Sequence, residues 1–334
     1  MATTSDAGTA NDFTIYDEEF WAGAMESIDQ NVDVFNAASN NTMRIVTQRS
    51  LGNYSKHTII TQMAAAEVVD RRVNTADVAD QADNFMPMGE LTSPKLNRRI
   101  GPIAHTLDAW KKIGSNTSEM SLIAGRMIGE HVAKNYVESM VSTAVGALDA
   151  GPNEISKTST LETDFLRQAL ALMGDHASEV VAWVMHSAAA FQLLGDQTTG
   201  TGNGYTSLES VAGAGIARAS LATFGRPVII TDSASLVDAS GTPDEYITLG
   251  LTRDGVVAME SEERSIVSQV ITGSNSLFFR IQGEYAFNVS AKGANYVGAV
   301  NPADSTLATG ASWTDVVSTK QLCGVSLRTA QVNP

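Results

Sequence analysis

The residues best suited to nucleophilic catalysis lie around position 186. His186 is followed directly by Ser187, and Asp175 or Asp232 could supply the acid of a Ser–His–Asp triad. The Gly-x-Ser-x-Gly motif that places the nucleophile of α/β-hydrolases on a sharp turn is absent. These residues keep one alternative function open, a soluble α/β hydrolase-like enzyme that uses His186 and Ser187.

A glycine-rich stretch at residues 200–204, GTGNG, could in principle cradle a phosphate group. A P-loop requires Lys and then Ser or Thr after the last glycine, whereas Tyr205 and Thr206 follow here. The dinucleotide fingerprint requires the glycines to follow a strand directly, and this stretch does not. We therefore interpret residues 200–204 as a loop without a cofactor.

Metal-binding and redox patterns are equally weak. The five histidines show no ligand spacing, and His-Glu-x-x-His does not occur. Glu260, Glu262 and Glu263 could bind a divalent cation, but the pattern is more typical of a solvated turn. The single cysteine, Cys323, lies in an apolar segment typical of a buried residue. The sequence predicts no catalytic residue, no metal and no cofactor.

Charge is distributed unevenly along the 334 residues, whose formal net charge is −15. Residues 1–43 contain eight acidic residues and no Lys or Arg, whereas residues 44–112 contain ten basic and seven acidic residues. The acidic total argues against a protein that grips nucleic acid over its whole surface. An acidic arm beside a basic segment is typical of subunits that bind one another through complementary charge. The alternative is that both segments are ordinary solvated surface.

Export and membrane signals are not found. The first ten residues lack a cationic region followed by an apolar stretch. No run approaches the ~20 apolar residues that span a bilayer. We expect a soluble product made in the cytoplasm.

Several segments carry a clear periodicity. Apolar residues recur at three- and four-residue steps over 13–35, which predicts one helix or two short ones, resting on its own core or on a neighbour. Residues 44–112 show short β-type runs at 44–47 and 57–61 but no common hydrophobic pattern, so we expect a projecting element that partners bury. Residues 116–148 predict a helix of about 50 Å, which Gly151-Pro152 terminates.

The remainder alternates between helix and strand, which predicts an α/β unit with a sheet covered on its faces. Helices are expected at 161–173 and 187–194, and strands at 180–185, 227–231 and 245–250. Further β character is expected at 256–259 and 265–271. Two separate strands, 277–281 and 285–289, are expected around Gly283. A strand at 296–300, a short helix or turn at 311–317 and a final strand at 322–329 complete the prediction.

Four stretches resemble one group of tailed-phage major capsid proteins. They read LGNYSKHTII at 51–60, VVDRRVN at 68–74, KLNRRIGPIAHTLDAWKKIG at 95–114 and NPADSTLATGASWTDVVSTKQLCGV at 301–325. The resemblance runs from about residue 49 onward. It implies an α+β fold of the Hong Kong 97 type, also called the Johnson fold.

The domain division that this resemblance implies can be placed on the chain. Residues 1–43 become an N-terminal arm and 44–112 an extended β-hairpin loop. Residues 113–153 and 262–334 become a peripheral domain that contains the spine helix 116–148. Residues 154–261 become an α/β axial domain, whose loop 200–204 is expected near the capsomer centre.

The resemblance also implies the function and the partners. The chain is expected to self-assemble into hexamers and pentamers of an icosahedral head that encloses double-stranded DNA, without sequence-specific binding and without a membrane. Only about 45 residues precede the loop, so we expect no cleaved scaffolding segment but a separate scaffolding protein or none, a portal and a possible decoration protein. Nothing marks Lys56 or Lys95 of the loop as reactive, so we expect no covalent cross-link.

Charged residues are the candidates for contacts between subunits, in place of a catalytic site. They are Asp17, Glu18, Glu19, Lys56, Arg71, Arg72, Arg98 and Arg99. A phage tail-tube or decoration protein is the other alternative function, and those proteins lack a long spine helix.

Overall fold

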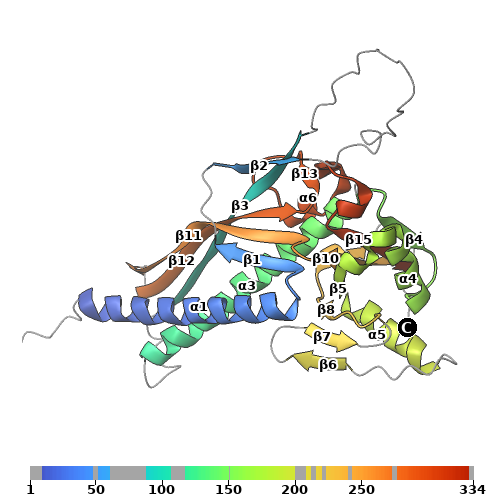
Figure 1. Cartoon of the computed structure of the whole chain (residues 1–334). Helices are drawn as coiled ribbons and strands as arrows, with labels where there is room; N and C mark the ends of the chain where they lie inside the picture. The colour runs from blue at the N-terminus through green and yellow to red at the C-terminus, as the bar shows by residue number, and fades with distance from the viewer. Residues whose placement is uncertain are drawn as a thin grey trace, which may run out of the picture.

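The structure is a computed structural model that describes residues 10–47, 52–60, 88–106, 117–149, 151–199, 208–211, 216–219, 223–239, 243–272 and 277–330. Two long helices lie against a narrow, elongated sheet, and a wider sheet with its own helices lies at one end (Figure 1). The arrangement is α+β, as predicted.

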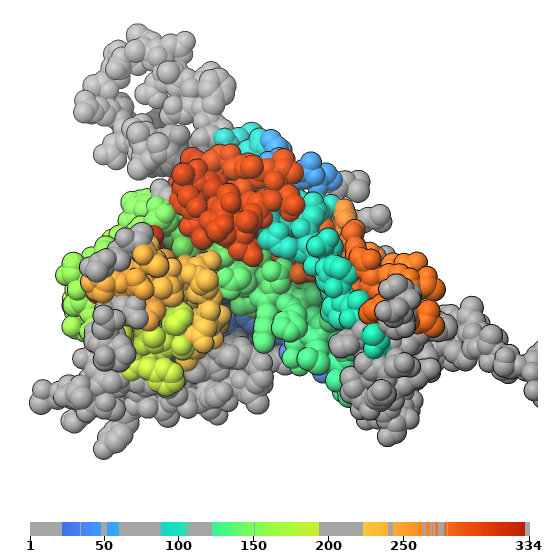
Figure 2. Space-filling view, turned by 180° about the vertical axis from the view of Figure 1, so that it is seen from behind, coloured from blue at the N-terminus to red at the C-terminus, as the bar shows by residue number. Residues whose placement is uncertain are grey.

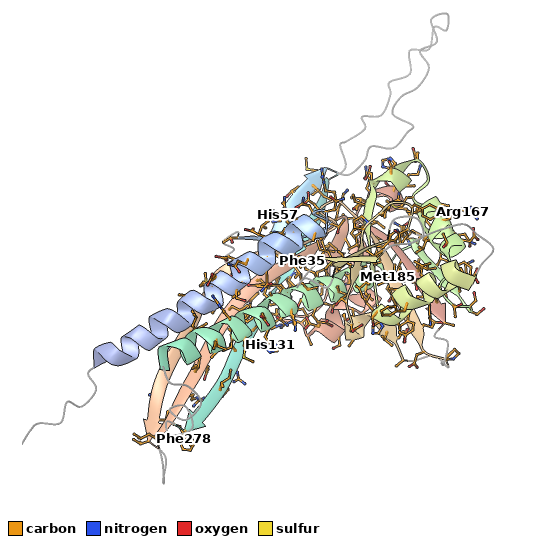
Figure 3. All side chains as sticks on the ribbon, turned by 90° about the horizontal axis from the view of Figure 1, so that it is seen from below. Phe35, His57, His131, Arg167, Met185 and Phe278 are labelled. Atoms are coloured by element: carbon orange, nitrogen blue, oxygen red, sulfur yellow. The ribbon has the colours of Figure 1, made fainter. Side chains whose placement is uncertain are left out.

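The two long helices, α1 (Ala10–Ala38) and α3 (Thr117–Asp149), pack side by side and run in the same direction (Figures 1 and 3). The apolar residues predicted for the first helix face α3 and the sheet: Ala24, Ile28 and Phe35 are buried. The helix is a single one and rests on its own chain, which resolves the two alternatives left open by the sequence. It ends where Asn40 and Asn41 adopt positive φ values of 58° and 57°.

The narrow sheet has the strand order β1-β11-β12-β3-β2. Its strands are β1 (Met43–Thr47), β2 (Tyr54–Ile60), β3 (Met88–Thr106), β11 (Val256–Thr272) and β12 (Leu277–Ala291). β1 pairs parallel to β11, and the other pairs are antiparallel. The far ends of β11, β12 and β3 form a three-stranded ribbon that extends along α3 to Phe278 (Figure 3). We call residues 97–106, 262–272 and 277–285 the distal ribbon.

Two expectations for this sheet were wrong. Residues 277–291 form one strand and not two, because Gly283 pairs with Ile266 inside the ladder, where an added Cβ would lie 3.0 Å from the Ile266 side chain. The glycine therefore permits a close approach rather than a turn. The segment 44–112 is also not buried by partners alone: Leu96 is fully buried, because α3 and β12 supply apolar surface from distant parts of the sequence.

The wider sheet has the order β4-β15-β10-β5-β8-β7-β6, with β9 paired to β10. Its strands are β4 (Glu154–Lys157), β5 (Val180–Met185), β6 (Leu208–Val211), β7 (Ile216–Ala219), β8 (Val228–Ile230), β9 (Val237–Asp238), β10 (Glu245–Thr252) and β15 (Gly324–Ala330). Val184 faces the core around α3, and its neighbours Trp183 and Met185 face a second core. The second core also contains residues of α4 (Thr163–Leu172) and α5 (Ser187–Thr199).

The last strand corrects the expected layout. We expected residues 262–334 to belong to the peripheral domain and not to the α/β axial domain, but β15 pairs with β10 and β4 in the wider sheet. Its residues Val325 and Leu327 are fully buried there, so β15 finds its apolar partners in the α/β unit. The expected boundary between residues 261 and 262 falls inside the continuous strand β11.

The segment between β12 and β15 covers one side of α3. It contains β13 (Ala294–Tyr296), α6 (Asp304–Leu307), β14 (Trp313–Asp315) and the 3-10 turns η4 (Gly310–Ser312) and η5 (Thr319–Gln321). β13 and β14 form a two-stranded sheet. Seen from behind (Figure 2), this red segment lies above the green residues of α3, and α3 contacts both α6 and η4. Two further 3-10 turns, η2 (Gly174–Glu179) and η3 (Ala234–Leu236), adjoin the wider sheet.

Gly146 of α3 gives a test of this packing. Gly→Ala inside a helix ordinarily stabilises a protein by about 0.5–1 kcal/mol. Here a methyl group would overlap the carbonyl oxygen of Leu307 and lie 2.8 Å from Nε1 of Trp313, which donates to that oxygen. We expect Gly146→Ala to lower the free energy of unfolding by about 1–3 kcal/mol, measured by denaturant titration of the monomer. A gain in stability would contradict the packing described.

Among the described residues, no helix is long and apolar enough to cross a membrane.

Candidate functional site

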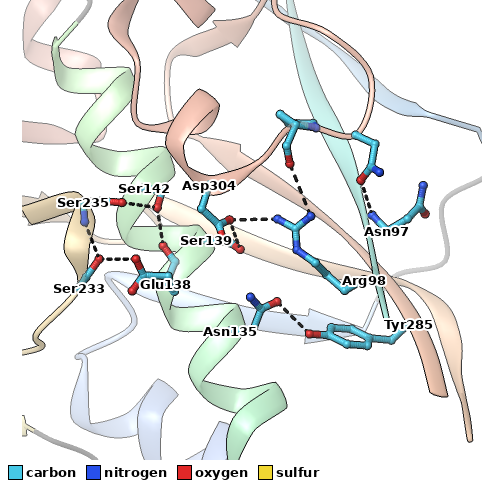
Figure 4. Close-up of polar contacts among 12 residues, drawn as sticks. Asn97, Arg98, Asn135, Glu138, Ser139, Ser142, Ser233, Ser235, Tyr285 and Asp304 are labelled. Carbon is cyan, nitrogen blue, oxygen red and sulfur yellow. Dashed lines mark hydrogen bonds and ion pairs between the residues drawn. The ribbon is translucent and has the colours of Figure 1, made fainter. Parts of the chain in front are cut away.

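Arg98 is bound within its own chain. Its guanidinium donates from Nη2 to Oδ1 of Asp304 at 3.0 Å, and the same oxygen accepts a hydrogen bond from Oγ of Ser139 at 2.7 Å (Figure 4). The Arg98 side chain is only 19% exposed. This contact joins β3, α3 and α6, so Arg98 has a structural role that sequence reasoning did not foresee.

Arg99 lies on the opposite face of β3 and is exposed. It stands across the ladder from Glu284 and lines a shallow hollow of about 310 Å³ together with Glu262 and Glu284. One exposed cation and two carboxylates therefore lie together on the open face of the distal ribbon. Of the neighbouring pair, Arg99 is the more exposed side chain, and Arg98 borders the same hollow.

The other predicted contact residues are placed only in part. Lys56 of β2 forms an ion pair of 2.5 Å with Glu90 of β3, and both side chains are more than half exposed. Such an exposed pair contributes little to stability, so Lys56 is free to exchange partners. Asp17, Glu18 and Glu19 belong to helix α1, but their side chains are not among those that the structure describes. Arg71 and Arg72, like the loop 200–204, lie outside the described residues.

His186, Ser187 and Asp232 do come together, but not as a triad. The backbone N–H of Ser187 donates to Oδ1 of Asp232 at 3.3 Å, and Nε2 of His186 lies 3.6 Å from the same oxygen. Nδ1 of His186 accepts from the backbone N–H of Ala188 at 3.2 Å, and its ring stacks on Tyr246. A triad needs the histidine between the serine and the acid, whereas here the acid lies at the N-terminus of α5. The geometry is that of a helix cap.

The pKa of Asp232 tests this capping role. The hydrogen bond from the Ser187 side chain holds the pKa of Asp232 below its usual range. A lowered carboxyl pKa contributes stability above the unfolded-state value, and this contribution is lost as pH falls through the folded-state value. We expect Ser187→Ala to raise the pKa of Asp232, and Ser187→Thr to preserve it, in carboxyl-carbon NMR titrations. Equal pKa values in the alanine variant and the wild type would refute the hydrogen bond from the Ser187 side chain to Asp232.

The expected absence of a metal site remains a prediction, although the described acids already have partners. Glu260 accepts a hydrogen bond from the Tyr136 hydroxyl at 3.2 Å, and Glu262 pairs with Lys95. No group of three or more potential ligands occurs among the described residues. Burial raises the pKa of the Cys323 thiol to about 12, so it stays protonated and is a poor nucleophile.

Among the residues that the structure describes, the most highly connected charge is Arg328, which sequence reasoning missed. Its guanidinium contacts Glu154 of β4, Asp149 of α3 at 2.7 Å and Asp238 of β9 at 2.7 Å. The arginine is 13% exposed, and its three partners are 23–34% exposed. Burial raises the pKa of Glu154 despite the attraction of Arg328. One cation thus joins the end of the long helix to the wider sheet, a link we call the Arg328 hub.

A second polar link joins α3 to the segment after β8. Oγ of Ser233 donates to Oε1 of Glu138 at 2.8 Å, and the hydroxyls of Ser142 and Ser235 lie 2.7 Å apart (Figure 4). The partners are about 95 positions apart in sequence, so no local sequence pattern predicts that they meet. Ion pairs and hydrogen bonds of this kind fix the relative position of helix and sheet rather than activate a substrate.

Solved structures define the class of the fold. A chain from Mycobacterium phage Adephagia matches with a TM-score of 0.52 and 8% identity, covering 89% of this chain and 91% of that one. A chain of the cyanophage Pam1 capsid asymmetric unit matches with a TM-score of 0.51 and 11% identity, covering 86% and 88%. At such identities the likeness shows the fold alone, and this is the phage capsid fold of the Hong Kong 97 type that we expected.

The family follows from the sequence itself. The profile of the Gp13-like family, described as Major capsid protein 13-like, matches residues 12–326. The chain therefore belongs to this family of major capsid proteins and is a structural subunit of a phage capsid. No curated protein was found to match the sequence.

Proposed function

We propose that copies of this chain form hexamers and pentamers that close into an icosahedral head around double-stranded DNA. The observation that carries this proposal is the apolar surface that single subunits leave open on their projecting strands. Met88 at the start of β3 is 71% exposed, and Val267 and Leu277 on the distal ribbon are 66% and 47% exposed. Apolar side chains gathered on projecting elements are typical of surfaces that partners cover.

Charge supports the same assembly. The acidic residues Asp17, Glu18 and Glu19 would meet cations of a neighbour, for which Lys56, Arg71, Arg72 and Arg99 are the candidates. Interfaces that bury roughly 1,200–2,000 Å² in all are stable, and extended strands reach such an area without a larger core. The acidic total suits an inner wall to which packaged DNA does not adhere, so we propose contact with DNA that is not sequence-specific.

We further infer that the chain performs no catalysis and forms no covalent cross-link. His186, Ser187 and Asp232 cap a helix, and the Cys323 thiol is buried. Assembly is proposed to take place in the host cytoplasm, with a separate scaffolding protein, a portal and a possible decoration protein as partners.

Microscopy of the expressed chain tests the proposal. We expect size-exclusion chromatography and negative-stain images to show rings of five or six subunits, or closed shells, and shells to increase when the scaffolding protein is co-expressed. A small monodisperse monomer at high concentration, with no rings or shells even when the scaffolding protein is co-expressed, would contradict the proposal.

A further inference from the structure

A groove of about 670 Å³ separates the two long helices from the wider sheet. Its apolar floor comes from four elements. They contribute Val32 and Phe35 of α1, Ile45 of β1, Ala133 and Val137 of α3, and Ile229 and Ile230 of β8. Figure 3 shows Phe35 near the end of α1, where the helix pair meets the α/β unit. We call this feature the helix groove.

The rim of the helix groove is predominantly acidic. Glu130 and Glu138 of α3 and Asp232 after β8 line it, with Lys134 as the one cation among the lining residues described. Glu138 and Asp232 already accept hydrogen bonds from Ser233 and Ser187, which hold both carboxylates at the rim. Glu130 is exposed and forms no ion pair with another described residue. The groove therefore has an apolar floor and a net negative rim.

The helix pair gives the groove its shape. An added Cβ at Gly23 would touch Leu122, and one at Gly129 would touch Ala24 and Ser27, so the two helices cross closely where side chains are small. Beyond this crossing, the stretches 31–35 and 130–138 form the two helical walls. A trough bounded on one side by two parallel helices and on the other by a sheet accepts a third helix, whose apolar face lies on the floor. The walls are about two helical turns long.

We propose that the helix groove binds one cationic amphipathic helix of a separate assembly partner. This inference rests on the proposed shell function and deepens it, because it assigns the partner a place and a chemistry. The acidic rim selects Lys or Arg on the flanks of the helix, and the floor selects Leu-type side chains at i, i+3, i+4 and i+7. The same rim disfavours a nucleic acid, an anionic helix and the acidic N-terminal residues of a second copy.

The first experiment measures binding of a designed probe by fluorescence anisotropy. The probe is a leucine–lysine amphipathic helix of about 18 residues, compared with the same helix carrying glutamate for lysine and with a scrambled leucine–lysine peptide. We expect wild-type protein to bind the probe at least about tenfold more tightly than either control peptide. Equal affinity for all three peptides would overturn the proposal.

Variants locate the binding. Ala133→Trp fills the floor and Glu130→Lys reverses the rim, and each is expected to weaken probe binding by about tenfold. Glu284→Lys, an exposed charge reversal on the distal ribbon, is the matched control and is expected to change nothing. Loss of binding with Glu284→Lys, or unchanged binding with both groove variants, would contradict the proposal. If Ala133→Trp fails to fold by circular dichroism, the exposed Glu130→Lys decides alone.

The outcomes separate this inference from the proposed function. If the wild type forms rings or shells but the groove variants bind the probe as tightly as the wild type does, the groove proposal is refuted and the shell function is not. Wild type that never assembles refutes the shell function, whatever the peptides do. If Ala133→Trp instead changes the oligomeric state of the chain without any peptide, the groove is occupied by a second copy and the proposal of a cationic partner is wrong.

Discussion

Replacing Arg328 with methionine is expected to lower the free energy of unfolding by about 3 kcal/mol at neutral pH. The methionine keeps most of the aliphatic stem but leaves Asp149, Glu154 and Asp238 facing one another without their shared cation. Removing one partner of a mostly buried ion pair leaves uncompensated charge, which costs more than the pair itself contributes. Denaturant titration of monomeric protein measures the loss.

The pH dependence of this loss has a defined sign. Burial already holds the pKa of Glu154 above its usual value of 4.5, and removal of Arg328 raises it further. A carboxyl whose folded-state pKa is raised costs stability when ionised, and this cost disappears as pH falls below the unfolded-state pKa. The difference between wild type and Arg328→Met should therefore shrink from pH 7 toward about pH 4.

Two comparisons make the Arg328 result specific. Arg167→Met removes an exposed pair with Asp164 and should cost less than about 1 kcal/mol. Glu154→Gln placed on Arg328→Met should recover part of the loss, because it removes one of the stranded charges. An equal loss for both arginine variants, independent of pH, would show that the Arg328 hub contributes no more to the free energy of unfolding than an exposed ion pair.

Reversing the charge of Arg98 is expected to unfold the subunit partly or wholly, at a cost of about 3–5 kcal/mol. Arg98→Glu places a carboxylate beside Asp304 in a site where the two side chains are 19% and 27% exposed. It also disturbs the Ser139 hydroxyl, which donates to Asp304. Thermal or denaturant unfolding of the monomer measures the change.

The adjacent Arg99→Glu is the matched control, and its expected result differs in kind. Arg99 is exposed and faces away from α3, so its reversal should change monomer stability by less than about 0.5 kcal/mol. If Arg99 contacts a neighbouring subunit, Arg99→Glu should still reduce the yield of rings and shells. A folded, stable Arg98→Glu monomer that merely fails to assemble would return Arg98 to the intersubunit contacts.

Local patterns predicted the elements with strong periodicity. The helix expected at 116–148 is observed at Thr117–Asp149, because one apolar side and the Gly151-Pro152 stop define it. The spacing of Ala24, Ile28 and Phe35 likewise predicted the packed side of α1. The strands at 180–185 and 245–250 were found because buried β-runs between turn residues are local signals.

Features that depend on distant pairing could not be predicted. Gly283 resembles a turn residue in sequence, and only its partner Ile266 shows that it lies within a ladder. The Arg328 hub joins residues of α3, β4, β9 and β15 whose positions alone give no reason to associate them. The helix groove has the same character, because the four elements that line it meet only in the folded chain. Charge alone likewise could not separate the half-buried Arg98 from the exposed Arg99.

The position of β15 between β4 and β10 has a consequence for synthesis on the ribosome. β4 and β10 have no direct ladder with each other among the described strands, so the wider sheet stays divided until residues 324–330 have emerged. The narrow sheet, by contrast, can pair β11 with β12 as soon as both are translated. A nascent subunit can therefore pair β5 with β8 and β10 early, but it joins β4 to this sheet only after residues 324–330 have been translated.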